Sequence, residues 1–273
     1  MSRIESRFAE LKSANRAAFV PFITAGDPDL ETSFEILQEL PAAGADLIEL
    51  GVPFSDPMAD GPAVQASSLR ALEAGMSVPR LLEMVKRFRK SDSKTPVVLM
   101  GYYNPIHAYG TARFAKDAAA AGVDGLITVD LPPEEDQVLR APANAHGLDI
   151  VRLATPTTDD NRLKTIASGA GGFLYYVSIT GVTGTKDFAQ GEVEQAVARI
   201  KAKAHLPVAV GFGIKTPEQA AQIARFADGA VVGSAIVTQI AEGLKNGASR
   251  AELAQNVLKF CTALAQSVHA ARA

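Results

Sequence analysis

The sequence predicts an α/β fold, a (β/α)8 TIM barrel that residues 1–273 form as a single domain with an extra N-terminal helix. Two observations predict it. The length is 273 residues, and a chain of about 250 is typical of one such barrel. Short apolar segments also alternate with helical patterns along the chain. Most of these segments are continuously apolar, which is typical of parallel strands that helices cover on both faces.

The elements follow in order from this pattern. The expected strands are rich in Val, Ile, Leu, Phe and Ala, and lie at 18–24, 46–50, 96–101, 125–129, 149–154, 172–177, 207–211 and 228–232. The expected helices lie between or after them, at 30–42, 78–90, 111–121, 217–226 and 250–265. Residues 1–16 are expected to form the additional helix, which would cover the bottom of the barrel. An open doubly wound sheet is the alternative, but residues 24–28 lack the glycine spacing of its nucleotide loop.

Charge and composition restrict the partners and the compartment. A net charge of −3 provides no long-range attraction for nucleic acid or an anionic membrane. No uncharged apolar run reaches the about 18 residues of a membrane span, and residues 1–16 do not resemble a targeting peptide. The single cysteine, Cys261, excludes a disulfide framework and favours a reducing compartment. We therefore expect a cytoplasmic protein.

Two long gaps follow predicted strands, at residues 51–76 and 178–192. The carboxyl ends of barrel strands are where enzymes of this fold place their chemistry. We therefore expect these gaps to be loops that act as lids or partner surfaces; simple surface insertions are the alternative.

Three glycine-rich turns, at 181–184, 211–214 and 233–235, follow the last three predicted strands. Glycine lets backbone N–H groups approach an anion closely, and a helix N-terminus adds a favourable dipole. Gly213, Gly233 and Ser234 are therefore expected to bind a phosphate group. The alternative is that these glycines only turn each strand into the next helix.

Carboxylates are the expected proton carriers. Glu49 lies in an apolar run at the end of the second strand, where burial would raise its pKa or demand a partner. Such tuning suits a general acid or base; a structural ion pair is the alternative. Asp56 and Asp60 occupy the following loop and could supply a second carboxylate, or be ordinary turn residues.

Aromatic residues are expected around these carboxylates. Tyr175, on the sixth strand, could donate its hydroxyl to a reacting oxygen. Phe22, Tyr102 and Phe212 fall at strand ends and would line an apolar pocket, although core packing explains all four equally well. No histidine or lysine lies at a predicted strand end, so we expect neither a metal site nor a Schiff-base lysine.

These residues stand in motifs that resemble the tryptophan synthase alpha subunit family. The most specific is LIELGVPFSDPMADGP at 47–62. The others are PFITAGDP at 21–28, GYYNP at 101–105, DLPP at 130–133, GVTG at 181–184 and GFGI at 211–214. The resemblance covers essentially the whole chain.

The resemblance implies a lyase that cleaves indole-3-glycerol phosphate to indole and glyceraldehyde 3-phosphate, the alpha reaction of L-tryptophan biosynthesis. Glu49 would be the main acid–base group, Asp60 would bind the indole N–H, and Tyr175 would lie in the active site. The implied substrate-binding residues are Phe22, Tyr102, Thr183, Gly184, Phe212, Gly213, Gly233 and Ser234.

The resemblance also implies a partner. Members pair with a beta subunit in an alpha2beta2 heterotetramer; pyridoxal phosphate is bound there, and the alpha chain carries no cofactor. Loops 53–60 and 178–192 would close over the site and signal to that partner. The alternatives are another phosphate-binding barrel, such as an indole-glycerol-phosphate synthase or an isomerase, and a subunit that mainly activates its partner.

Overall fold

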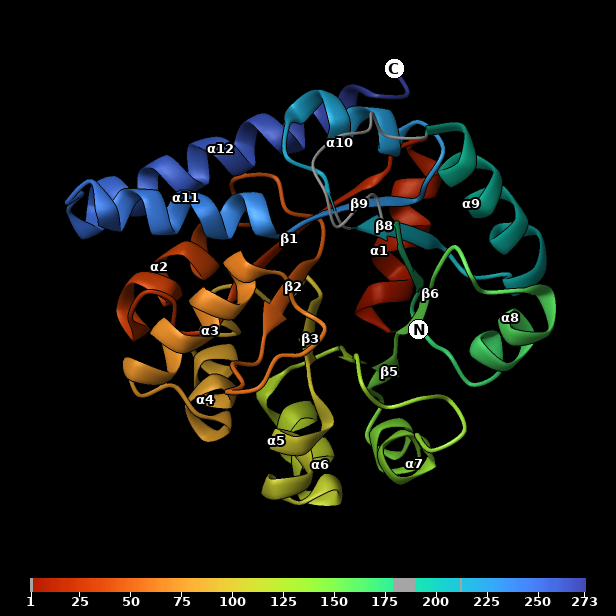
Figure 1. The fold of residues 1–273 in the computed structure, drawn as a ribbon, viewed down its shortest axis with the longest axis horizontal. Coiled ribbons are helices and arrows are strands. Elements are labelled where there is room, and N and C mark those ends of the chain that lie inside the picture. The colour runs from red at the N-terminus through yellow and green to blue at the C-terminus, as the bar shows by residue number, and fades with distance from the viewer. Residues whose placement is uncertain (1, 179–189, 212) are drawn as a thin grey trace.

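The computed structural model describes residues 2–178, 190–211 and 213–273. In these residues nine parallel strands form one sheet in the order β5-β4-β3-β2-β1-β9-β8-β7-β6, and helices surround it (Figure 1). The strands are β1 Ala18–Thr24, β2 Ile48–Gly51, β3 Val97–Gly101, β4 Gly125–Thr128, β5 Asp149–Ile150, β6 Arg152–Ala154, β7 Leu174–Val177, β8 Val208–Gly211 and β9 Gly229–Val232.

The two outermost strands of that order are halves of one predicted strand. β5 and β6 are separated by a single residue, Val151, whose N–H donates to the carbonyl of Leu126 in β4 at 2.9 Å. On the other side, β6 pairs with β7. The sheet therefore closes on itself, and the prediction of a (β/α)8 barrel is confirmed.

The helices begin where the sequence predicted in five cases. They are α2 Leu30–Glu39, α4 Val78–Phe88, α6 Thr111–Ala121, α10 Pro217–Ala224 and α12 Arg250–Ala270. Capping explains these starts: Asp29 accepts the N–H groups of Glu31 and Thr32, and Ser249 forms a capping box with Glu252.

Other helices lie in the remaining gaps between strands, for which no helix bounds were predicted. They are α3 Pro62–Glu73, α5 Tyr103–Tyr109, α7 Gln137–Ala145, α8 Asp160–Ala167, α9 Gln190–Ala204 and α11 Ser234–Lys245. The expectation of a loop across residues 51–76 was wrong in its second half, because Pro62 occupies the first turn of α3, where proline is tolerated. Only residues 52–61 precede that helix as a loop.

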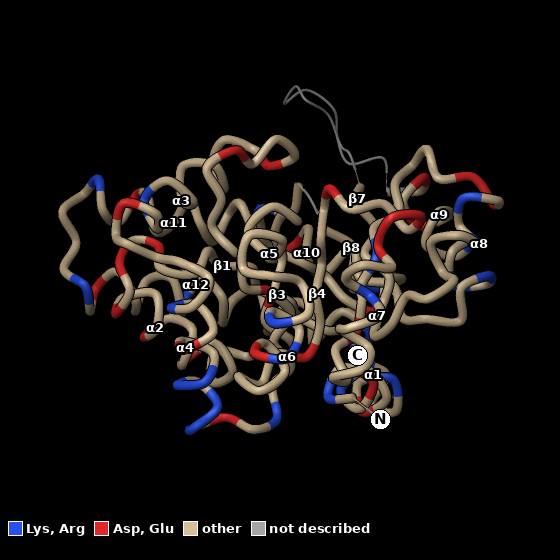
Figure 2. Tube along the Cα trace, turned by 90° about the horizontal axis from the view of Figure 1, so that it is seen from below, with Lys and Arg blue, Asp and Glu red and all other residues tan. Residues whose placement is uncertain are grey.

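Helix α1, Arg3–Ser13, covers one end of the barrel, as the sequence predicted (Figure 2). Its buried residues Ile4, Phe8 and Leu11 pack in one cluster with side chains from the barrel interior. The interior members of that cluster are Ala18, Val20, Leu47, Val98, Ile127, Val151, Phe173, Tyr175, Ala209 and Val231. This helix therefore closes the amino-terminal end, and substrate access is left to the carboxyl end. No helix in the described part of the chain is long and apolar enough to cross a membrane.

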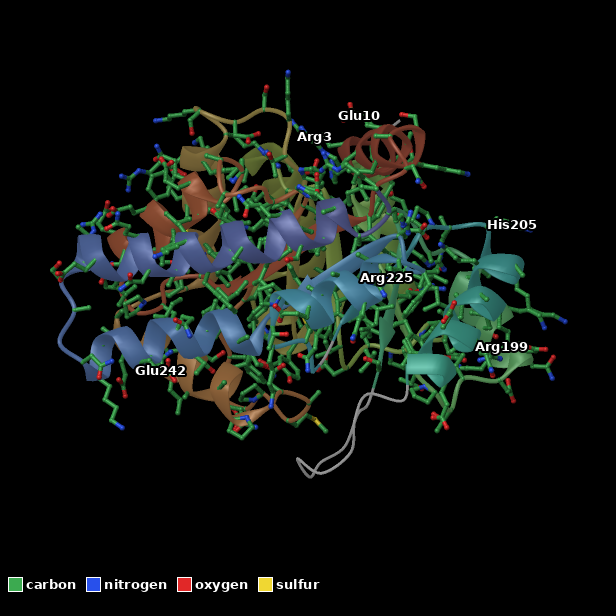
Figure 3. The ribbon with its side chains drawn as sticks, turned by 90° about the horizontal axis from the view of Figure 1, so that it is seen from above. Arg3, Glu10, Arg199, His205, Arg225 and Glu242 are labelled. Carbon is green, nitrogen blue, oxygen red and sulfur yellow. The ribbon has the colours of Figure 1, made fainter. Side chains whose placement is uncertain are left out.

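An ion-pair network fastens α1 to the barrel. The carboxylate of Asp124, which precedes β4, accepts hydrogen bonds from Arg3 at 2.8 Å, from Arg89 at 2.7 Å and from the backbone N–H of Val97 at 2.8 Å. The Asp124 and Arg89 side chains are only 4% and 10% exposed. Arg3, which is labelled in Figure 3, reaches this network from α1.

We expect Asp124→Ala to lower the free energy of unfolding by about 3–5 kcal/mol, because it leaves the buried guanidinium of Arg89 without its carboxylate. Urea unfolding followed by circular dichroism measures this. Glu10→Ala is the matched control, since Glu10 pairs with Arg7 on the exposed side of α1 and is 67% exposed. Equal stability of the two variants would contradict the assigned role of Asp124.

Candidate active site

Glu49 lies on the inner face of the barrel. It is two residues after Leu47 of the interior cluster, and strand side chains alternate between faces. The residue is 2% exposed, and its Oε1 has no hydrogen-bond partner among the described residues. Burial, and secondarily the charge of Asp60, raises the pKa of Glu49 from 4.5 to about 8. A carboxyl group with this pKa can both donate and accept a proton near neutral pH.

Asp60 is the second carboxylate at this site, and Asp56 is not. Asp60 is half-buried in the loop before α3, close enough to Glu49 to raise its pKa. Burial raises the pKa of Asp60 itself, and a hydrogen bond with Tyr102 opposes that rise. Asp56 is exposed, and its carboxylate accepts a hydrogen bond from the hydroxyl of Ser55 at 2.5 Å. The fold thus separates two aspartates that the sequence alone left equivalent.

Tyr175 shares the inner face with Glu49. It follows Phe173 of the interior cluster by two residues and is 4% exposed. Burial raises its pKa well above 10, and the charges of Glu49 and Asp60 act in the same direction. The hydroxyl therefore stays protonated near neutral pH. It fits only because residue 211 is glycine: a Cβ there would lie 2.0 Å from the Tyr175 hydroxyl oxygen.

Two of the three residues predicted to line an apolar pocket are among the described residues. Phe22 pairs in register with Glu49, and its ring lies across Gly51, where a Cβ would approach it to 2.7 Å. Tyr102 is 3% exposed and follows β3. The third predicted member, Phe212, lies outside the described residues.

Four partly buried side chains that were not among the predicted site residues pack against the interior cluster: Met100, Val129, Leu153 and Val177. Each is two residues after an inward-facing residue of its strand, so the strand period was the available signal. Val129 and Leu153 also line a cavity of about 260 Å³ beside loop 130–133. These four residues form an apolar wall at the carboxyl ends of their strands.

Three of the five residues predicted to bind phosphate are among the described residues: Gly213, Gly233 and Ser234. Gly233 caps the N-terminus of α11, and exposed Ser234 is the first residue of that helix. The first N–H groups of a helix have no acceptor within it, so they can bind an anion. Gly213 has a φ of +81°, a backbone conformation that favours glycine. Thr183 and Gly184 lie outside the described residues.

The described residues contain no group of three or more His, Cys, Asp or Glu side chains placed to hold a metal ion. What they bring together is a buried carboxyl, a second carboxylate, a protonated phenol and a helix N-terminus. The carboxyl groups can donate and accept protons, and the helix N-terminus presents N–H groups that can bind an anion.

Comparison with known proteins agrees with this geometry. The tryptophan synthase alpha chain family matches residues 8–269. The tryptophan synthase subunit alpha of Legionella pneumophila str. Paris is 42% identical, with a TM-score of 0.91 over 98% of both chains. Tryptophan synthase of M. tuberculosis in an aminoacrylate-bound form is 35% identical, with a TM-score of 0.87 over 98% of this chain and 100% of that one. This chain therefore belongs to the tryptophan synthase alpha chain family.

Proposed function

We propose that Glu49 and Asp60 carry the acid–base chemistry of the family's alpha reaction in this chain. The chain is a lyase that cleaves indole-3-glycerol phosphate to indole and glyceraldehyde 3-phosphate, a step of L-tryptophan biosynthesis. The observation that carries the residue assignment is the buried Glu49 carboxyl on the inner face of the barrel, whose Oε1 has no partner among the described residues and whose pKa is about 8.

The reaction makes two demands on proton transfer. The bond between indole C3 and the first glycerol carbon breaks only when C3 receives a proton and the hydroxyl on that same glycerol carbon loses one. The electron pair of the broken bond restores the indole ring, and the hydroxyl carbon becomes the aldehyde. No net proton is gained, so one carboxyl group that gives a proton and takes another can serve both steps. Glu49 is assigned this role.

Asp60 and Tyr175 complete the chemistry in this proposal. Positive charge develops on the indole nitrogen when C3 is protonated, and a nearby carboxylate stabilises it. We assign Asp60 to stabilise that nitrogen. Its position in the loop at the carboxyl end of the barrel supports this assignment. Tyr175 remains a hydrogen-bond donor near neutral pH and is assigned to a substrate oxygen.

Binding follows from the remaining groups. Phe22 and the apolar wall would hold the indole ring. Gly213, Gly233 and Ser234 would bind the phosphate at the N-terminus of α11, together with Thr183 and Gly184. Helix termini bind phosphate through their N–H groups and dipole, without a requirement for lysine or arginine.

The proposal includes a partner. The relatives from M. tuberculosis are tryptophan synthases, and we propose that this chain binds a beta subunit as part of such an enzyme. Pyridoxal phosphate would belong to that partner, and this chain would hold no cofactor of its own. The buried thiol of Cys261, the chain's one cysteine, suits a reducing, cytoplasmic setting.

The direct test is release of indole from indole-3-glycerol phosphate by the purified chain, alone and with a tryptophan synthase beta subunit. Slow release that rises sharply with the partner supports both the activity and the partnership. Release that the beta subunit leaves unchanged overturns the partnership, and no release from folded protein in either condition overturns the activity.

Glu49→Gln should lower kcat by about 10²–10⁴ or more, because general acid–base groups contribute this much. Steady-state indole release measures the effect. Asp56→Asn is the matched control, since it neutralises an exposed carboxylate a few residues away and should retain the wild-type rate without the partner. A Glu49→Gln variant with wild-type turnover would remove Glu49 from the mechanism.

The raised pKa of Glu49 predicts a pH-dependent stability. Between pH 4.5 and about 8 the folded protein keeps the Glu49 proton while the unfolded chain releases it, so stability falls as pH rises through this window. Glu49→Gln lacks this titration. Its stability relative to wild type should therefore increase by an amount on the order of several kcal/mol between pH 4.5 and 8.5.

Urea unfolding of both proteins at the two pH values measures the change. A relative stability of the two proteins that does not vary with pH would show that Glu49 is ionised, or solvated, in the folded chain.

Ser234→Asp should weaken phosphate binding while leaving the fold intact. A carboxylate at a helix N-terminus stabilises the helix but repels a phosphate there. We expect at least about a tenfold loss of affinity for glycerol 3-phosphate by calorimetry, corresponding to roughly 1.4 kcal/mol. Ser234→Ala is the control: it removes only the hydroxyl and keeps the N–H groups, so its loss should be smaller. Unchanged affinity in Ser234→Asp would place the phosphate elsewhere.

A further inference from the structure

Tyr102 contacts the loop that carries Asp60 at two separate points. Its hydroxyl oxygen accepts the backbone N–H of Ala59 at 2.9 Å, and its ring centroid lies 5.4 Å from that of Phe54. Tyr102 itself is 3% exposed and sits between β3 and α5. The loop is thus attached to a rigid part of the barrel at residues near its beginning and its end.

The same hydroxyl lies beside Asp60, the residue that follows Ala59 in the loop. Because it uses a lone pair to accept the N–H of Ala59, its proton is free to be donated to the carboxylate. The hydrogen bond between the two side chains lowers the pKa of Asp60 against the effect of burial. Burial, with the charge of Asp60 as a lesser cause, raises the pKa of Tyr102 to about 12, so the hydroxyl remains a donor near neutral pH.

We propose that Tyr102 is a positioning residue, whose hydroxyl holds the Asp60 carboxylate at the barrel mouth by bonding both that side chain and the adjacent backbone of Ala59. This assignment rests on the proposed function of Asp60. It differs from the expectation that Tyr102 is a wall of the indole pocket, since a wall needs only the ring. The hydroxyl is a separate element of the site, and it can be removed without the ring.

Tyr102→Phe removes the hydroxyl and keeps the ring. Tyr103→Phe is the matched control, because it deletes a hydroxyl one residue away that lies 3.2 Å from Thr111 Oγ1. The first readout does not depend on activity. The pKa of Asp60 is measured by NMR in protein labelled with 13C at aspartate Cγ, with the signal assigned by its loss in Asp60→Asn.

The pKa of Asp60 should rise in Tyr102→Phe and stay at the wild-type value in Tyr103→Phe. An unchanged Asp60 pKa in Tyr102→Phe overturns the proposal, whatever the activity of the chain. Circular dichroism and the remaining NMR signals report whether the variant is folded.

The second readout is kinetic and uses indole release. Tyr102→Phe should lower kcat about tenfold, the effect of losing one hydrogen bond to a charged group, with little change in KM. In the Asp60→Asn background the same substitution should have almost no further effect, because the carboxylate it positions is absent.

Two outcomes of the kinetic test overturn the proposal. An equal loss in both backgrounds would mean that the hydroxyl acts independently of Asp60, and a rise in KM alone would mean that Tyr102 only binds substrate. If the wild-type chain releases no indole, the proposed function is contradicted instead. The NMR titration then still tests the link between Tyr102 and Asp60.

Discussion

The burial of Glu49 is the constraint on which the site depends. A buried carboxyl group on the inner face of a barrel is unfavourable when charged, and the Oε1 of Glu49 has no hydrogen-bond partner among the described residues. The neutral form of Glu49 therefore persists at pH values well above the usual pKa of a glutamate. The remaining features preserve this condition: apolar neighbours exclude water, and the second carboxylate stands close enough to discourage ionisation further.

The architecture of the barrel separates stability from chemistry. The amino-terminal end is closed by α1 and by the ion pairs of Asp124, whose partners come from three separate segments of the chain. The carboxyl end carries Asp60, Tyr102 and the N-terminus of α11. The packed interior lies between the two ends. The carboxyl end can therefore contain the buried carboxyl group of Glu49, while the ion pairs of Asp124 stabilise the fold at the opposite end.

Much of this could be predicted from the sequence, and the reasons for the rest are physical. The eight strands could be predicted because they are continuous apolar runs. Glu49 could be predicted because it is a carboxylate within the otherwise apolar residues 47–51. The sequence could not show whether Asp56 or Asp60 belongs to the site, because this depends on the path of the loop 52–61 over the end of the barrel. Helix α3 was missed because Pro62 signals a break unless it is known to occupy the first turn. Thr183, Gly184 and Phe212 remain predictions.

The pairing of β1 bears on how the chain reaches this structure. β1 lies between β2 and β9, so one of its edges meets a neighbour about 30 residues away and the other meets residues 229–232. During synthesis the second edge of β1 stays unpaired until almost the whole chain has emerged. Any partial barrel that forms before then has open edges, and such edges associate readily with other chains. Closure between β1 and β9, rather than the formation of any one βα unit, ends this exposure.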